Sequence, residues 1–265
     1  MPSDNIYAMV DPEIFAAVQE QIEKDSQVKE VLTPHHRHHH HPLDKQSRLW
    51  VVLNYAQSLT GAKVIELTTT ADEGFKRLRD CIQGLVNIVK DYPYYKYNGI
   101  WSRDIQNVAF LVLFRGWLQR SYAPGNAENS LLTIEEVGSV LGIPVNSKTE
   151  DKFHLTIEEY LHAVLGLVEE LTRLTTNAVT QHDFLRPQMI NRFIKDIHSS
   201  FQVLNLKNDS LRRRGDGLKY NVKKVEEVNY DLILRNLIPR GVDEEGTEKM
   251  EDVKEDAKGP SERLG

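Results

Sequence analysis

The sequence has few of the features that mark several common classes of protein. Cys81 is the only cysteine among 265 residues, which excludes an intrachain disulfide framework and a cysteine-based zinc site. No apolar run approaches the ~20 residues that a membrane-spanning helix needs. The N-terminus also lacks the basic and apolar regions of a secretory signal. We therefore expect a protein of a reducing compartment, located in the cytoplasm and the nucleus.

Sequence motifs of the common enzyme classes are absent as well. The chain contains no P-loop, GxGxxG, HExxH or GxSxG. A histidine-rich tract at 35–41 lies between Pro34 and Pro42, and low-complexity tracts of this kind bind transition metals adventitiously. The other four histidines lack metal-ligand spacing: His154, His162, His182 and His198. The sequence predicts no functional metal site.

The charge is distributed unevenly along the chain. The formal net charge is −6, which by itself argues against nucleic acid as a partner. Residues 241–265, however, contain nine acidic and four basic residues and carry −5 of this charge. The remaining body is nearly neutral, so it can present a basic face on one side and an acidic face on the other. The acidic tail has few apolar residues and is predicted to be disordered.

The periodicity of apolar residues predicts an all-α fold. Glycine (15) and proline (10) are scarce for a β-rich protein, and apolar residues recur at helical spacing. The first helix is expected to start at Asp11-Pro12-Glu13 and to stop at Thr33-Pro34. Residues 108–114 are apolar all round, which is typical of a central buried helix. Two capping boxes, at 133–136 and 156–159, begin further helices. We count seven or eight helices in one bundle.

Cations and aromatic residues alternate in one part of the chain. Residues 75–79 place Lys76, Arg77 and Arg79 within one helical turn, and residues 92–97 crowd four tyrosines around Lys96. Trp101 and Arg103 follow. Cations neutralise phosphates and aromatic faces stack on unpaired bases, so the pattern favours single-stranded nucleic acid. The alternative is a helix junction packed with tyrosines beside a solvated charged face.

A second basic segment lies near the C-terminal end of the bundle. Between residues 207 and 224 there are seven cations and two acids, including Arg212, Arg213 and Arg214. These arginines could contact phosphates, or form an ordinary charged helix face. An apolar residue also recurs every seven positions: Leu204, Leu211, Leu218, Val225 and Leu232. The second seam of a coiled coil is poor, so this stripe is expected to pack in the bundle or at a subunit interface.

Carboxylates form the third candidate group. Metal-dependent cleavage of a phosphodiester needs several acids that converge on Mg²⁺. Neighbouring residues of a helix face different directions, so each adjacent pair offers at most one inward acid. The favoured interpretation is that these carboxylates face solvent. The candidates are Glu169, Glu170, Glu226 and Glu227.

The C-terminal segment resembles a known family. Residues 204–232 contain LNLKNDSLRRR, DGLKY, VKKVEEV and YDL, which closely resemble the C-terminal helix of the translin family. Further matches lie at 141–143, 153–161, 170–174 and 177–180. The resemblance covers roughly residues 75–237. It is weaker before residue 75, where the histidine-rich loop at 33–42 resembles an insertion. It therefore implies a helical domain over 1–240 and an acidic extension over 241–265.

The resemblance carries several expectations. It implies a seven-helix bundle that assembles into octamers, alone or with the paralogue translin-associated factor X. It also implies binding of single-stranded RNA and DNA. The mixed complex of the family is a Mg²⁺-dependent endoribonuclease linked to the removal of small-RNA passenger strands and to tRNA processing.

The catalytic carboxylates of this family belong to the paralogue. Their positions correspond here to Asn107, Phe110, Gly166 and Glu170, of which only Glu170 is acidic. One carboxylate holds a catalytic Mg²⁺ poorly. We therefore expect this chain to be catalytically weak or silent by itself and to have no cofactor of its own.

The nucleic-acid-binding segments of the family correspond to residues 75–79 and 94–103, with Asn98 and Ile100 standing where animal members have histidines. The leading hypothesis is a subunit that binds single strands mainly through these two segments. Residues 212–214 are secondary candidates. Two alternatives stay open. The homo-oligomer could itself be a Mg²⁺-dependent ribonuclease using Glu170, or the chain could be a helical interaction scaffold.

Overall fold

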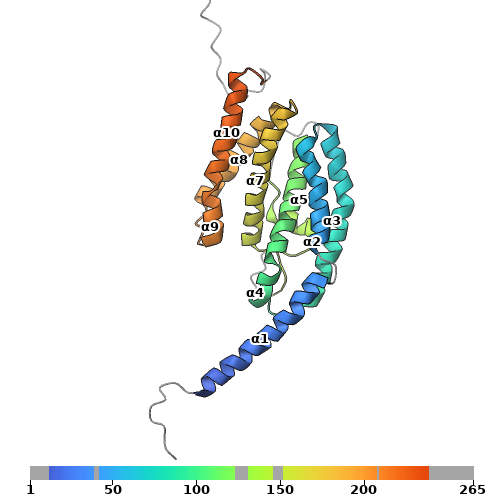
Figure 1. Cartoon of the computed structure of the whole chain (residues 1–265), viewed down its shortest axis with the longest axis vertical. Helices are drawn as coiled ribbons and strands as arrows, with labels where there is room; N and C mark the ends of the chain where they lie inside the picture. Colours follow the sequence, from blue (N-terminus) through green and yellow to red (C-terminus); the bar gives the residue numbers. More distant parts are fainter. Residues whose placement is uncertain (1–11, 39–41, 123–130, 146–151, 208, 239–265) are drawn as a thin grey trace, which may run out of the picture.

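The protein is a bundle of α-helices, as a computed structural model shows (Figure 1). The structure describes residues 12–38, 42–122, 131–145, 152–207 and 209–238. Within these ranges no β-strand occurs, and Val145 and Leu155 form an isolated bridge. The elements are α1 (Pro12–His38), α2 (Pro42–Asn54), η1 (Tyr55–Ser58), α3 (Ala62–Val89), α4 (Tyr94–Tyr97), η2 (Asn98–Ile100), α5 (Ser102–Tyr122), α6 (Ile134–Leu141), α7 (Ile157–Thr180), α8 (Leu185–Val203), α9 (Asp209–Asp216) and α10 (Leu218–Leu234).

The long helices confirm the all-α prediction. Seven of those described have 13 residues or more, namely α1, α2, α3, α5, α7, α8 and α10. None of the described helices has the length and apolar content needed to cross a lipid bilayer. The predicted acidic tail over 241–265 lies outside the described residues.

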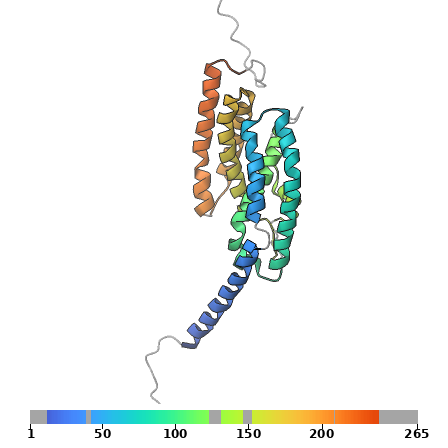
Figure 2. The same ribbon diagram turned by 45° about the vertical axis from the view of Figure 1, so that its right-hand side comes forward.

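The helices are arranged around α5 and α7, which pack against each other. On one side α5 contacts α2 and α3, and on the other side α7 contacts α8 and α10. Figures 1 and 2 both show α9 and α10 at one side of the bundle and α3 at the other. In both views α1 extends away from one end of the bundle. The helices α3 and α9, which carry the two predicted groups of cations, therefore lie on opposite sides of the bundle.

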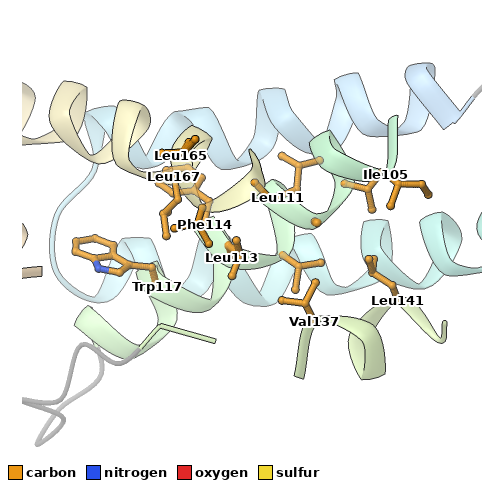
Figure 3. Close-up of a cluster of buried hydrophobic side chains, with 14 of the residues drawn as sticks. Ile105, Leu111, Leu113, Phe114, Trp117, Val137, Leu141, Leu165 and Leu167 are labelled. Atoms are coloured by element: carbon orange, nitrogen blue, oxygen red, sulfur yellow. The ribbon is translucent and has the colours of Figure 1, made fainter. Parts of the chain in front are cut away.

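The core is centred on α5, as its apolar sequence predicted. Leu111, Val112, Leu113 and Phe114 are each at most 1% exposed, so the helix is buried on several faces at this level. Figure 3 shows Leu111, Leu113 and Phe114 of α5 among buried side chains of α6 and α7. Burying a large apolar side chain stabilises the fold by about 1.5–3 kcal/mol, so α5 is the element on which the others pack.

Both predicted capping boxes are present. In α6 the Glu136 amide donates to Thr133 Oγ1 at 3.2 Å, and the Thr133 amide donates to Glu136 Oε2 at 2.7 Å. In α7 the Glu159 amide donates to Thr156 Oγ1 at 3.1 Å, and the Thr156 amide donates to Glu159 Oε2 at 3.0 Å. Each box satisfies backbone donors that a helix start leaves unpaired, which fixes where α6 and α7 begin.

Several predicted helix boundaries were wrong. The first helix continues through Pro34 to His38, so residues 33–38 of the predicted loop are helical, and residues 39–41 lie outside the described part. Proline removes one backbone hydrogen bond and its ring crowds the carbonyl four residues back, so a helix continues through it only at a cost in stability. The last helix is divided at Gly217 into α9 and α10.

The seven-residue apolar stripe packs mainly inside the bundle. Leu211, Leu218, Val225 and Leu232 are at most 3% exposed, because α9 contacts α7 and α10 contacts α7 and α8. Leu204 is the exception and is 42% exposed. Leu204 lies between the end of α8 and the start of α9. Because it is outside a helix, the seven-residue spacing does not place it on the buried face.

Candidate nucleic-acid interface

Two predicted cations of α3 are open to solvent. The side chains of Lys76 and Arg77 are 77% and 62% exposed. Lys76 Nζ lies 3.9 Å from Glu73 Oε2, and Arg77 Nε lies 4.0 Å from Glu73 Oε1. Exposed ion pairs at such distances are weak and are screened by salt. Both cations can therefore turn from Glu73 to a phosphate without a change in the backbone.

Arg79, the third cation of this turn, has a structural role that its sequence position did not indicate. Its Nε donates to the Val140 carbonyl at 2.9 Å, and its Nη2 donates to the Ser139 carbonyl at 3.2 Å. Gln83 Nε2 donates to the Gly142 carbonyl at 2.6 Å. These bonds satisfy carbonyls at the C-terminal end of α6. Arg79 is exposed and joins α3 to α6, so a phosphate would have to compete with these bonds for its guanidinium.

Tyr97 and Trp101, which were predicted either to stack on bases or to pack, are core residues. They are 4% and 1% exposed. The Trp101 ring lies 6.1 Å from the Tyr94 ring and 5.8 Å from the Phe153 ring, measured between centroids. Aromatic clusters of this kind stabilise a core through burial and ring contacts. A base could reach neither ring in this conformation. Both residues therefore fit the alternative interpretation, in which the aromatic side chains pack at a helix junction.

The rest of the 94–103 segment offers a different set of exposed groups. Lys96 Nζ donates to Asp25 Oδ1 of α1, which raises the pKa of Lys96 and lowers that of Asp25. Arg103 is exposed. Tyr95 is 60% exposed and was missed among the predicted site residues. It lies in the same tyrosine run as its buried neighbours, and only the direction of each side chain on the short helix distinguishes them.

Among the secondary candidates, Arg212 and Arg213 are exposed on α9, whereas Arg214 is bound to its neighbours. Arg214 Nε and Nη2 donate to the Glu169 carboxylate at 3.0 and 3.1 Å. Its Nη1 also donates to the His162 carbonyl at 3.1 Å. This paired geometry is among the stronger arginine–carboxylate contacts. Arg214 therefore joins α9 to α7.

A cleft of about 300 Å³ lies where four helices meet. Its walls come from α2, α5, α7 and α9. The structure brings together here all four positions that correspond to the catalytic carboxylates of the paralogue: Asn107, Phe110, Gly166 and Glu170. Trp50 and Arg214 also line the cleft. The former was not singled out from the sequence, because no local pattern on its own helix relates it to α5 or α7.

Glu170 is buried and belongs to a polar network. Gln57 Nε2 donates to Glu170 Oε1 at 2.5 Å, and Arg173 Nη2 donates to the same oxygen. Asn177 Nδ2 donates to Gln57 Oε1 at 2.8 Å, and Gln181 Nε2 donates to the Gln57 carbonyl at 2.7 Å. The carboxylate thus takes part in holding η1 against α7, which is a structural use of the residue.

The other predicted carboxylates are surface charges. The side chain of Glu169 is 54% exposed, and Glu226 pairs with Lys195 of α8 at 2.8 Å. Glu227 lies 3.8 Å from Lys223, one turn earlier in α10. The interpretation as solvent-facing helix charges fits all three. In the described part of the chain, no three histidine, cysteine or acidic side chains are grouped so that they could hold a metal ion.

Glu159, the capping residue of α7, is 2% exposed, and burial raises its pKa against the opposing hydrogen bonds of Thr156 and Ser102. Between the ordinary glutamate pKa of about 4.3 and this raised value, the folded state keeps a proton that the unfolded state has lost. Stability therefore falls as pH rises through this window. Glu159→Gln keeps the capping box without ionising. The free energy of unfolding of Glu159→Gln, measured in urea, should therefore rise relative to that of the native protein as pH increases.

The matched control for this prediction is Glu136→Gln, which alters the equivalent residue of the α6 box, where the side chain is 45% exposed. A stability difference between Glu159→Gln and the native protein that stays constant from pH 4.5 to 8 would contradict the prediction.

Comparison with known proteins agrees with this architecture. The model of the Translin family matches residues 16–236. Translin of Gallus gallus is 42% identical over 179 residues, which cover 68% of this chain and 74% of that protein. Translin of Homo sapiens is 46% identical over 165 residues, which cover 62% of this chain and 68% of that protein. The crystal structure of apo-NeC3PO superposes with a TM-score of 0.51 over 83% of this chain and 97% of that chain. At 14% identity this last match shows a common fold alone. Because the family model spans most of the sequence, the chain belongs to the Translin family.

Proposed function

We propose that this protein binds single-stranded RNA and DNA as one subunit of an octamer, formed with copies of itself or with the paralogue translin-associated factor X. The observation that carries the proposal is the exposed pair Lys76 and Arg77 on α3, in a chain of this family. Among the described residues, both groups contact Glu73: its carboxylate lies 3.9 Å from Lys76 and 4.0 Å from Arg77, and its carbonyl accepts from Arg77 Nε at 3.4 Å. Phosphates of a strand would replace that carboxylate.

The exposed groups favour a single strand over a duplex. Tyr95 is an exposed aromatic side chain in the second family segment, and Arg103 is an exposed cation of the same segment. Aromatic faces bind bases only where the bases are unstacked, as in single strands. Arg212 and Arg213 belong to α9, a helix on the far side of the bundle from α3. In one subunit they would contact a different part of the nucleic acid.

The test is binding of a labelled single-stranded RNA, measured by fluorescence anisotropy over a range of salt concentrations. The affinity of the native protein should fall as salt rises, because each neutralised phosphate releases counterions. Lys76→Ala/Arg77→Ala should bind more weakly. The slope of log affinity against log salt should become shallower by about 0.7 for each phosphate that the variant no longer neutralises.

The matched control is Lys223→Ala/Lys224→Ala, which removes the same charge from exposed positions of α10. Equal reductions of affinity in the two double variants would mean that total charge, and not the α3 site, determines binding. An affinity unchanged by Lys76→Ala/Arg77→Ala would make the site assignment wrong. A native protein that binds no strand at low salt would leave only the scaffold alternative.

The same proposal assigns RNA cleavage to the paralogue. Three of the four positions in the cleft are Asn107, Phe110 and Gly166, none of which is a carboxylate. The remaining one, Glu170, already accepts hydrogen bonds from Gln57 and Arg173. Such a set of residues holds Mg²⁺ poorly. Cleavage of RNA by the highly purified chain, stopped by EDTA, would contradict this assignment and support the ribonuclease alternative.

A further inference from the structure

The cleft between α2, α5, α7 and α9 has an aromatic wall. Trp50 of α2 and Phe110 of α5 both line it, with ring centroids 5.5 Å apart and planes inclined by 54°. Both side chains are half-buried, unlike Trp101 and Trp117, which are 1% and 2% exposed. Ring surface is therefore available at the cleft. Aromatic faces are the sequence-tolerant part of sites that bind unpaired bases.

Polar groups with the chemistry of a base edge line the same cleft. Gln106 and Asn107 are consecutive half-buried amides of α5, and an amide side chain both donates and accepts hydrogen bonds. Both hydrogen bonds that the Glu170 carboxylate accepts in the described part of the chain end on Oε1. Its Oε2 therefore retains acceptor capacity. Amides pair with adenine and carboxylates accept from the amino group of cytosine in protein complexes with nucleic acids.

Gly166 keeps the cleft open. A Cβ at this position would lie 3.3 Å from Phe110 Cδ2 and 3.6 Å from Arg214 Nη2. A larger side chain would enter the space between the aromatic wall and the guanidinium. The position is in the middle of α7, where glycine is less favourable than alanine by about 1 kcal/mol. Space in the cleft is therefore kept at a cost in helix stability.

From this arrangement we propose that the cleft receives one unpaired nucleobase that carries an exocyclic amino group. The base would lie against Trp50 and Phe110, and its amino group would donate to Glu170. The volume is at the lower end of the range of small-molecule sites, which suits one base and not a longer segment. The inference rests on the proposed binding of single strands, because the strand delivers the base to the cleft.

The guanidinium of Arg214 places a positive charge at the edge of the cleft. It is fixed by the Glu169 carboxylate and by the His162 carbonyl, so it stays at the edge of the cleft. Burial and the nearby Arg214 both lower the pKa of His162, whose Nε2 lies 3.4 Å from Ser210 Oγ. The cleft therefore presents a fixed cation and a neutral imidazole beside the Glu170 carboxylate. This mixture suits a neutral, polar ring better than a metal ion.

The test fills the cleft. Gly166→Leu places a side chain between Phe110 and Arg214, whereas Gly84→Leu makes the same change at a helical glycine of α3 with open space around it. Cytidine, which has the amino group, should quench the fluorescence of Trp50 in the native protein and in Gly84→Leu. It should not do so in Gly166→Leu. Uridine, which lacks the amino group, should quench only at a higher concentration. Trp50→Phe identifies the quenched residue.

The second measurement uses a strand. Gly166→Leu should bind an oligocytidine about tenfold more weakly than the native protein, as expected when one base no longer stacks. Gly84→Leu should bind it unchanged. If Gly166→Leu does not fold, Asn107→Leu replaces an amide of the cleft without adding a side chain to α7, and it should give the same two results.

The outcomes separate this inference from the proposed function. Equal affinity of the native protein and Gly166→Leu for the strand, with no quenching by cytidine, overturns the nucleobase site and leaves strand binding intact. Equal quenching by uridine and cytidine overturns the part assigned to the amino group. A native protein that binds no strand overturns the proposed function, and quenching by cytidine in that protein would still support the cleft as a base site.

Discussion

Trp101→Ala should lower the free energy of unfolding by about 3–5 kcal/mol, the usual cost of truncating a buried aromatic residue. The side chain is 1% exposed and packs against Tyr94 and Phe153, so the variant leaves a cavity where α5 meets residues 153–155. Urea unfolding followed by circular dichroism measures the effect. Trp101→Phe should recover most of the stability, because it refills much of the cavity with an apolar ring.

This result separates packing from base stacking. If Trp101 stacked on bases, Trp101→Ala would keep its stability and lose affinity for RNA. The matched variant is Tyr95→Ala, which removes an aromatic ring that is 60% exposed. It should change stability little and lower the affinity for a single strand. The opposite pattern, with Tyr95 needed for stability and Trp101 needed only for binding, would contradict the assignment of both residues.

Glu170→Ala should lower the free energy of unfolding by about 3 kcal/mol. The substitution removes the acceptor of the Gln57 amide, and an unpaired polar group in the interior costs about 1–3 kcal/mol. The missing side-chain volume adds to this cost. Gln57 is 6% exposed and also accepts from Asn177, so the effect should spread along the contact between η1 and α7. Urea unfolding again provides the measurement.

The matched control for this second prediction is the adjacent Glu169→Ala. Glu169 is 54% exposed, so solvent screens its paired contact with Arg214, and its removal should cost less than removal of the buried Glu170 carboxylate. Equally small effects of the two substitutions on stability would mean that the polar network does not hold η1 against α7. The same two proteins test the ribonuclease alternative, since EDTA-sensitive cleavage that disappears only in Glu170→Ala would support a catalytic role.

Local features of the fold could be predicted from the sequence. The capping boxes at Thr133 and Thr156 depend on residues three positions apart, and the structure has both. The apolar run in α5 identified the central helix, because a helix that is apolar all round has no solvent-facing side. The buried stripe of α9 and α10 followed from its spacing. In each case the sequence signal is a spacing of nearby residues, although the burial of α5 and of the stripe also needs the neighbouring helices.

The site was less predictable, because its deciding contacts join distant parts of the chain. Arg79 was assigned to phosphate, and the carbonyls that bind it are about 60 residues away in α6. Trp101 was assigned partly to stacking, and its burial depends on Phe153 beyond α6. The cleft needs side chains from four helices. Composition and spacing indicate which side chains have the chemistry to bind a phosphate or a base. Tertiary contacts decide which of these side chains are exposed and not already bound to other residues.

The ion pair between Lys96 and Asp25 links α1 to the second binding segment. The helix α1 extends from the bundle and contacts little of it beyond α3 and η2. A phosphate that draws Lys96 away from Asp25 would remove one of the contacts that attach α1 to the bundle. Thermodynamic linkage is reciprocal, so whatever fixes α1 in place must weaken the hold of Lys96 on a phosphate by the same factor. If Lys96 contacts a phosphate as proposed, the projecting helix and that contact would be thermodynamically linked through one salt bridge.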